Sequence, residues 1–262
     1  MPTFNSHGTN LYYEDTGEGI PLLLLHGLTS NHAMFYQEID AFKGQYRVIA
    51  PDARGHGKSD KPEHYTLEDH VQDVIALLNH LELVSIYLIG VSMGSYIAQG
   101  VAIEESDRVK KLVLVSTKSH GEQSSMAELY SRHADEMQGL SMIDKLSYAS
   151  KYMFYNQTAV GKWLHETAKV SGQLTLHEQA IASDALIGFD FRTKLCDVRA
   201  ETLVISGTYD GLNPPDYGEE TAIMIPNAIF MEFKWSGHAP NVEQPDLFKE
   251  IVNNFLDESS KK

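Results

Sequence analysis

The segment Gly90-Val91-Ser92-Met93-Gly94 constrains the fold more than any other part of the chain, because a buried strand must turn there directly into a helix. The apolar run 86–89 precedes it, and a helical pattern follows it as far as Ala102. A serine at so tight a corner occupies strained backbone geometry, and small residues two positions before and after it let strand and helix approach each other. Gly90 and Gly94 meet this requirement.

An acid and a histidine occur later in the chain, each just after a predicted strand. Asp210 follows the apolar run 203–207, and His238 lies in Ser236-Gly237-His238-Ala239-Pro240. Serine, acid and histidine therefore occur in the chain order of the nucleophile-elbow hydrolases. We expect Ser92 to be a nucleophile, His238 its general base, and Asp210 the carboxylate that orients the imidazole.

Backbone N–H groups beside the serine are expected to hold a developing oxyanion. A helix that begins directly after Ser92 directs its unpaired N–H groups toward the space beside that serine. The expected donors are the N–H groups of Met93 and of Leu28, which comes after His26-Gly27 at the end of the apolar run 21–25. Four polar residues nearby are interpreted as supports of loop geometry and not as catalysts: His26, Arg54, His56 and Ser59.

With these residues in place, the chain resembles the α/β-hydrolase superfamily over nearly its whole length. Five ordered motifs carry the resemblance: His26-Gly27, the segment 52–59, the elbow at Ser92, Asp210 with Pro214, and Gly237-His238-Ala239-Pro240 followed by Glu243 and Pro245. The chain departs from the family at Ser95, where many relatives carry a third glycine. We interpret this departure as a packing variation that leaves the chemistry intact.

The alternation of short apolar runs with helical patterns predicts an α/β protein with a mostly parallel central sheet, flanked by helices and buried on both faces. An antiparallel hairpin is expected at the N-terminal edge of the sheet, turning at His7-Gly8. A helix is expected after Thr66, which would cap it together with Asp69, and the last helix should span residues 245–256. The expected parallel strands are 22–25, 47–50, 86–89, 112–115, 203–205 and 229–233.

The interval from Lys118 to Cys196 is too long for a loop without structure, since such loops rarely exceed about 15 residues in a compact domain. We predict a helical cap inserted at residues 118–196, with residues 1–117 and 197–262 forming the α/β-hydrolase core. The cap should lie over the carboxyl ends of the strands and cover the site. Four helices are expected in it: one opened by Ser125 with Glu128 toward Gly139, one opened by Ser141, one opened by Thr158 and ending at Gly172, and one opened by Thr175 with Glu178 and ending at Gly188.

Composition limits the partners of the chain. A net charge of −15 without a lysine-arginine cluster predicts no nucleic-acid or anionic membrane partner. The single cysteine, Cys196, cannot form an internal disulfide and is expected to be buried and inert. No secretory pattern, metal motif or nucleotide fingerprint is present, so we expect a cytoplasmic protein without a metal or cofactor, with a polar, frayed tail at residues 258–262.

Ester chemistry is the leading functional hypothesis, because relatives in this superfamily that open haloalkanes or epoxides carry aspartate at the elbow. The resemblance, to enol-lactonase-like and perhydrolase-like members in particular, implies hydrolysis of a small carboxylic ester or lactone through an acyl-serine. The alternatives are a perhydrolase or haloperoxidase without cofactor, a C–C bond hydrolase, and a ligand receptor that keeps the triad. The substrate should be small and apolar. Most apolar cap residues are expected to pack the cap, and the rest to line a pocket with Leu28 and Met93: Met126, Tyr130, Met137, Met142, Tyr152, Met153, Phe154, Tyr155 and Trp163.

Overall fold

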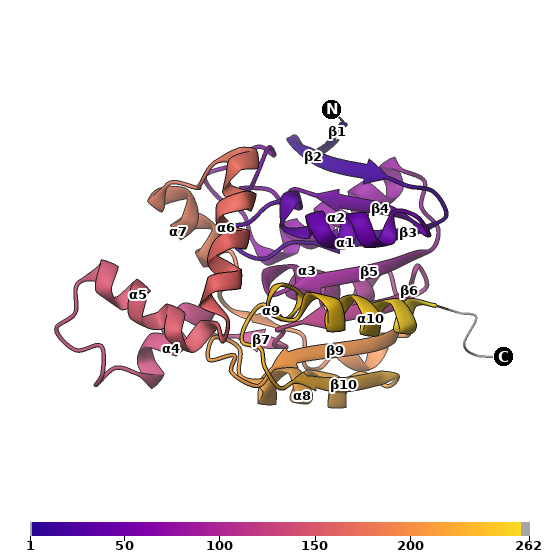
Figure 1. Cartoon of the computed structure of the whole chain (residues 1–262). Helices are drawn as coiled ribbons and strands as arrows, with labels where there is room; N and C mark the ends of the chain where they lie inside the picture. Colours follow the sequence, from indigo (N-terminus) through magenta and orange to yellow (C-terminus); the bar gives the residue numbers. More distant parts are fainter. Residues whose placement is uncertain (1, 258–262) are drawn as a thin grey trace.

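The chain is organised around an eight-stranded sheet in the order β1-β2-β4-β3-β5-β6-β9-β10 (Figure 1). The computed structural model describes residues 2–257, without the side chains of residues 142 and 143, so the predicted frayed tail lies outside the described residues. β1 pairs antiparallel with β2, β2 pairs antiparallel with β4, and the other neighbours are parallel, which confirms the predicted fold class. The strands are β1 (Thr3–Ser6), β2 (Thr9–Thr16), β3 (Ile20–Leu25), β4 (Tyr46–Pro51), β5 (Ile86–Val91), β6 (Val109–Val115), β9 (Glu201–Gly207) and β10 (Ala228–Phe233).

Helices cover both faces of this sheet, which explains why the central strands β3 and β5 are almost entirely apolar. In β5, Leu88 packs into the cluster on one face and Ile89 into the cluster on the other, because successive side chains of a strand point in opposite directions. The helices α2, α3 and α8 cover the first face, and α1 and α10 cover the second (Figure 1). The bounds of these helices are α1 (Tyr36–Phe42, after the 3₁₀ turn η1, His32–Phe35), α2 (Leu67–His80), α3 (Met93–Glu104), α8 (Pro215–Met224) and α10 (Pro245–Leu256). A short helix, α9 (Pro240–Glu243), precedes α10.

Local signals in the sequence placed several elements correctly. The hairpin of β1 and β2 turns at His7 and Gly8, which both have positive φ (49° and 90°), as a two-residue hairpin turn with matching twist requires. Thr66 and Asp69 form a reciprocal capping box at the start of α2.

No helix within residues 2–257 has the length and apolar character needed to cross a membrane.

Four helices lie between β6 and β9, at the place predicted for the cap (Figure 1). The chain enters and leaves this region through a short antiparallel ladder in which His120 pairs with Asp190, so both ends of the insert lie side by side. The domain limits 118 and 196 themselves stay a prediction. The elements are β7 (His120–Gly121), α4 (Ser125–Arg132), α5 (Met142–Met153), α6 (Gln157–Ser171), α7 (Leu176–Asp184) and β8 (Phe189–Asp190).

Two of the four predicted cap-helix starts were wrong by one or two residues. Ser124, not Ser125, caps α4 by accepting the N–H of Ala127, and Asn156, not Thr158, caps α6 by accepting the N–H of Ala159. Ser141 and Thr175 cap α5 and α7 as predicted, and α6 ends at Gly172.

Two cap helices end earlier than predicted. α4 stops at Arg132 and not near Gly139, and α7 stops at Asp184 and not at Gly188. Gly188 donates its N–H to the carbonyl of Gly121, so it belongs to the neck of the insert and not to the helix end.

The prediction for Cys196 was also wrong, because its side chain is exposed. It lies in the middle of a 3₁₀ turn, η2 (Leu195–Asp197), which has three residues per turn. Leu195 and Val198 therefore share the inner face and are buried, and the cysteine between them points outward.

A buried carboxyl group on α1 makes the stability of the fold depend on pH. Glu38 is 3 % exposed and accepts a hydrogen bond from Asn241 Nδ2 at 3.1 Å. Burial raises the pKa of Glu38 to about 7, although its hydrogen bonds and Lys249 act in the opposite direction. Between its ordinary pKa of 4.5 and 7, the folded state therefore binds more protons here than the unfolded chain, and stability falls as pH rises.

We expect Glu38→Gln to match the wild type in stability at pH 4.5 and to exceed it by about 3 kcal/mol above pH 7, since the amide carries no charge to desolvate. Urea unfolding at both pH values measures the difference. Glu18→Gln, at an exposed position before β3, is the matched control and should show no pH-dependent gain. A Glu38→Gln difference that stays constant with pH would contradict the assignment.

Candidate active site

The corner between β5 and α3 has the geometry that the sequence predicted. Ser92 has φ 52° and ψ −118°, a strained combination for a residue with a side chain. A Cβ on Gly90 would lie 2.2 Å from the carbonyl oxygen of Gly94, and a Cβ on Gly94 would lie 2.0 Å from that of Leu25. Both positions therefore require glycine, because the backbones of strand, helix and neighbouring strand are in direct contact.

The three residues predicted as a triad lie in one chain of hydrogen bonds. His238 Nε2 is 2.9 Å from Ser92 Oγ, and His238 Nδ1 is 2.8 Å from Asp210 Oδ2. Because an ionised carboxylate can only accept, Nδ1 carries the proton and Nε2 presents a lone pair to the serine hydroxyl. Asp210 is 2 % exposed and His238 is 8 % exposed, while Ser92 is half-buried and reachable.

The loop after β9 holds Asp210 in one orientation. Its Oδ1 accepts the backbone N–H groups of Leu212 and Asn213, each at 2.9 Å, which leaves Oδ2 for the histidine. Asn213 in turn donates from Nδ2 to the carbonyl of Ser116, at the end of β6, at 2.7 Å. The carboxylate is therefore tied to the neighbouring strand, and its rotation is fixed.

The two predicted oxyanion donors lie on the backbone beside the serine. A Cβ on Gly27 would be 3.6 Å from Ser92 Cβ, so the loop that continues into Leu28 packs directly against Ser92. Met93 is the first residue of α3. Among the described residues, no acceptor takes the N–H of Leu28 or of Met93. Their role as an oxyanion hole stays a proposal.

The residues interpreted as loop supports have structural partners. His26 Nδ1 donates to the carbonyl of Gly27 at 2.8 Å, and its Nε2 accepts the N–H of Ala53 at 3.0 Å. Arg54 forms a bidentate ion pair with Asp73, both N–O distances being 2.6 Å. Ser59 Oγ donates to the carbonyl of Asp52 and accepts the N–H of Tyr12, and His56 donates to the carbonyl of Arg54.

Glu243 is a site residue to which the sequence assigned no role, although it belongs to a quoted motif. Its Oε1 accepts the N–H groups of Gly237 (2.9 Å) and Ala239 (3.2 Å), which flank His238 on both sides. Its Oε2 accepts the N–H of Asn156 in the cap at 2.7 Å. In the sequence, Glu243 is only a carboxylate five residues after His238. The fold shows that its side chain contacts the loop that carries His238.

Ser95 does more than vary the packing, which corrects the interpretation drawn from the sequence. Its hydroxyl donates to the carbonyl of Ser92 at 2.6 Å and lies 2.8 Å from Thr117 Oγ1. Gln99 Nε2 donates to the same threonine oxygen at 2.9 Å and to the carbonyl of Lys118. This buried network connects the first turn of α3 to the end of β6.

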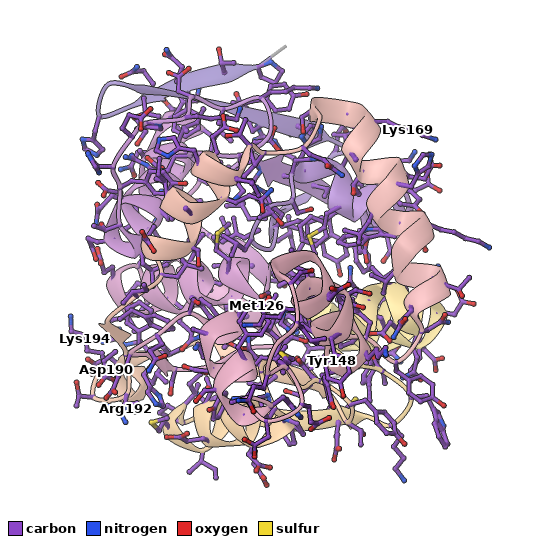
Figure 2. The ribbon with its side chains drawn as sticks, turned by 90° about the vertical axis from the view of Figure 1, so that its left-hand side faces the viewer. Met126, Tyr148, Lys169, Asp190, Arg192 and Lys194 are labelled. Carbon is purple, nitrogen blue, oxygen red and sulfur yellow. The ribbon has the colours of Figure 1, made fainter. Side chains whose placement is uncertain are left out.

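Most of the apolar cap residues pack the cap, as expected. Met126 on α4 and Tyr148 on α5, both labelled in Figure 2, pack on the cap's own apolar cluster. Trp163 is buried and donates Nε1–H to the carbonyl of Met34 at 3.0 Å, whereas Tyr155 is exposed. The side chain of Met142 lies outside the described residues.

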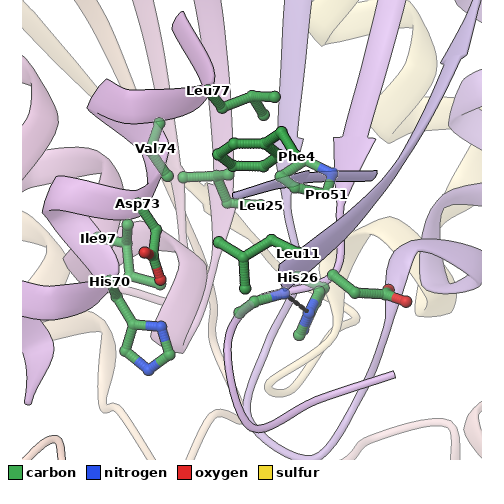
Figure 3. A pocket seen from close by; sticks show the side chains of 12 residues that line it. Phe4, Leu11, Leu25, His26, Pro51, His70, Asp73, Val74, Leu77 and Ile97 are labelled. Carbon is green, nitrogen blue, oxygen red and sulfur yellow. Dashed lines mark hydrogen bonds between the residues drawn. The ribbon is translucent and has the colours of Figure 1, made fainter. Parts of the chain in front are cut away.

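A small hollow lies between the N-terminal hairpin and α2 (Figure 3). Phe4 and Leu77 line its apolar part, and His26 and His70 its polar part, but Ser92 does not reach it. We assign it no substrate. Within residues 2–257, no three His, Cys, Asp or Glu side chains are grouped so as to hold a metal ion.

Comparison with known proteins decides the family. The model of a family described as the alpha/beta hydrolase fold matches residues 20–140. An AB hydrolase superfamily protein of Bacillus subtilis, YisY, is 31 % identical, with 94 % of each chain covered. The chain belongs to the α/β-hydrolase superfamily. This α/β hydrolase is also similar to 3-oxoadipate enol-lactonase 1 of Acinetobacter baylyi, with 26 % identity over 96 % of this chain and 95 % of the relative.

Among solved structures, this α/β hydrolase is similar to a thermophilic esterase from Thermogutta terrifontis. The two share 29 % identity with a TM-score of 0.79, over 97 % of this chain and 96 % of the esterase. Esterases and lactonases are therefore among its relatives.

We expect Gly94→Ala to destabilise the protein by at least about 2 kcal/mol, because the added methyl group meets backbone that cannot move aside. Gly161→Ala is the matched control, since nothing lies within 4 Å of a Cβ at that exposed position inside α6. The control should gain about 0.5–1 kcal/mol of stability. Urea unfolding measures both, and equal stability of the two variants would refute the close approach at the elbow.

Proposed function

We propose that this α/β hydrolase cleaves a small carboxylic ester or lactone through an acyl-serine intermediate. The observation that carries the proposal is the continuous hydrogen-bond chain from Ser92 Oγ through His238 to Asp210 Oδ2, with distances of 2.9 and 2.8 Å. The esterase and the enol-lactonase among its relatives support the same substrate class.

In the first half of the reaction, Ser92 Oγ attacks the carbonyl carbon while its proton passes to His238 Nε2. The negative charge that moves onto the carbonyl oxygen is held by the N–H groups of Met93 and Leu28. Asp210 stabilises the imidazolium through the bond to Nδ1. The carbon–oxygen single bond of the ester then breaks, and His238 gives its proton to the departing alkoxide.

In the second half, His238 takes a proton from water, and the resulting hydroxide attacks the acyl-serine. The carbon–Oγ bond breaks, and the proton returns to Ser92 through Nε2. With a lactone, the leaving alcohol stays attached to the acyl group, so hydrolysis gives a single hydroxy acid. The same residues and steps therefore serve both substrate types.

We expect Ser92→Ala to abolish the release of p-nitrophenol from the acetate and butyrate esters, because no oxygen remains to carry the acyl group. Asp210→Asn should keep the fold and lower kcat by about 10⁴-fold, since the amide favours the wrong imidazole tautomer. Stopped-flow absorbance measures kcat, and circular dichroism checks the fold.

Two results would count against this proposal. Wild-type rates in Asp210→Asn would remove that residue from the site. Labelling of Ser92 by a fluorophosphonate without turnover of either ester would favour a ligand receptor that retains the triad.

Activity should also decline toward acid pH, because a protonated imidazole cannot accept the serine proton. The rate must be read where the fold is intact. Burial lowers the pKa of His26 and His70, and that of His56 to about 3, so the folded state binds fewer protons than the unfolded chain below pH 6.5, and stability decreases there as pH falls. Initial rates and circular dichroism from pH 5 to 8 test this, and a flat rate would exclude His238 as the base.

A further inference from the structure

The loop that carries Asp210 contributes to the apolar core of the cap. Leu212, two residues after the acid, is buried in that cluster. Its buried partners come from α4, from the α4–α5 connection and from α5: Leu129, Met137 and Ala149. The two helices α4 and α5, which we call the arm, extend away from the sheet (Figure 1) and pack around a side chain that the core supplies.

Hydrogen bonds from the arm hold the same loop by its backbone. Arg132, at the end of α4, donates from Nη2 to the carbonyl of Gly211 at 2.5 Å and approaches that of Leu212 at 3.4 Å. The N–H of Gly211 donates to the carbonyl of Tyr152, at the end of α5, at 2.7 Å. The residue next to the acid is therefore bound to the arm through both its N–H and its carbonyl group.

One segment of the insert contacts both the loop that carries Asp210 and the loop that carries His238. It comprises the last two residues of α5 and the three residues that connect α5 to α6, and we call these residues, 152–156, the strap. The N–H of His238 donates to the carbonyl of Met153 at 2.6 Å, and a Cβ on Gly237 would lie 2.3 Å from that oxygen. Asn156, the last residue of the strap, donates its N–H to Glu243, which also binds both neighbours of the histidine.

An aromatic contact joins the same three segments at the surface. The ring of Tyr155 in the strap stacks on Tyr209, the residue before the acid, with centroids 4.7 Å apart. Its centroid is 6.0 Å from that of Trp235, three residues before the histidine. All three rings are about half exposed, so this contact lies on the outside of the strap.

We propose that the arm and the strap position the acid and the base of the triad relative to each other, and that Arg132, Leu212 and Glu243 are positioning residues. They act through Asp210 and His238, and the inference rests on the proposed function. The two catalytic loops leave from neighbouring strands, and the 2.8 Å bond between them has the strap as a shared support. Small displacements of such a pair lower the rate steeply, because proton transfer requires near-ideal geometry.

A positioning role differs from a substrate-lining role in its kinetic signature. The contacts described above go to the backbone and flanks of the two loops, so their loss should lower kcat by the same factor for every ester. Residues that only shape a pocket would change KM and the ratio of rates for acyl chains of different length. The two roles can therefore be separated by measurement.

The test compares Arg132→Gln and Leu212→Ala with the wild type on p-nitrophenyl acetate and butyrate. We expect kcat to fall about 10- to 100-fold for both variants, by equal factors on both esters, with KM within about twofold of the wild type. Arg132→Lys should recover part of the loss, because it retains a donor and a charge. Leu146→Ala is the matched control, since this leucine is exposed on α5 and its truncation should leave kcat unchanged.

Two readouts that need no turnover separate this inference from the proposed function. One is the rate at which a fluorophosphonate labels Ser92, and the other is the low-field proton signal of His238 Nδ1, assigned by its loss in Asp210→Asn. In Arg132→Gln and Leu212→Ala, the labelling rate should fall and the proton signal should weaken, even if the wild type cleaves neither ester.

The inference is overturned if the folded variants keep wild-type kcat or labelling rates and an unchanged proton signal. It is also overturned if only KM, or the ratio of rates on the two esters, changes. If Leu212→Ala fails to fold, Arg132→Gln provides the test, because residue 132 is exposed.

Discussion

The close approach of backbones at Gly94 is the constraint on which the site depends. A carbonyl oxygen of β3 occupies the space that a Cβ at this position would need, so α3 can start directly behind Ser92 and beside the loop after β3. In the reaction we propose, the first N–H of the helix and the N–H of Leu28 hold the oxyanion beside the serine. At this corner Ser92 has φ 52°, and its hydroxyl lies 2.9 Å from His238 Nε2.

Burial of the triad depends in turn on how the polar groups around it are satisfied. Asp210 is almost fully buried, yet each of its oxygens accepts a hydrogen bond, so neither is left without a partner. Both carboxylate oxygens of Glu243 also accept backbone N–H groups, Oε1 from the loop that carries His238 and Oε2 from the strap. Two carboxylates thus lie against the histidine: Asp210 contacts the imidazole directly, and Glu243 binds the backbone on both sides of it.

Much of this arrangement could be predicted from the sequence because its signals are local. Gly90 and Gly94 mark a corner that tolerates no side chain, and Asp210 and His238 each follow an apolar run that predicts a strand, although β10, before His238, lies at the sheet edge and is only partly buried. Ser124, Asn156 and Cys196 were misjudged because a cap or a buried face depends on one-residue register, which neighbouring serines, threonines and leucines leave ambiguous. Contacts between distant segments, such as Glu243 with the strap, have no periodic signal and become visible only once the chain is folded.

The insert contacts the loops that follow β9 and β10 through both its apolar core and its backbone. A lid that only excluded water could be attached by any hinge. In this insert, the apolar cluster includes Leu212 from the loop after Asp210, and a backbone carbonyl of the strap accepts the N–H of His238. In the arrangement we propose, packing within the cap and alignment of the loops that carry Asp210 and His238 are coupled, so sequence changes in the arm alter the rate without touching the substrate. An insert of this kind can vary its outer helices freely only while the residues that contact the acid and histidine loops stay complementary to them.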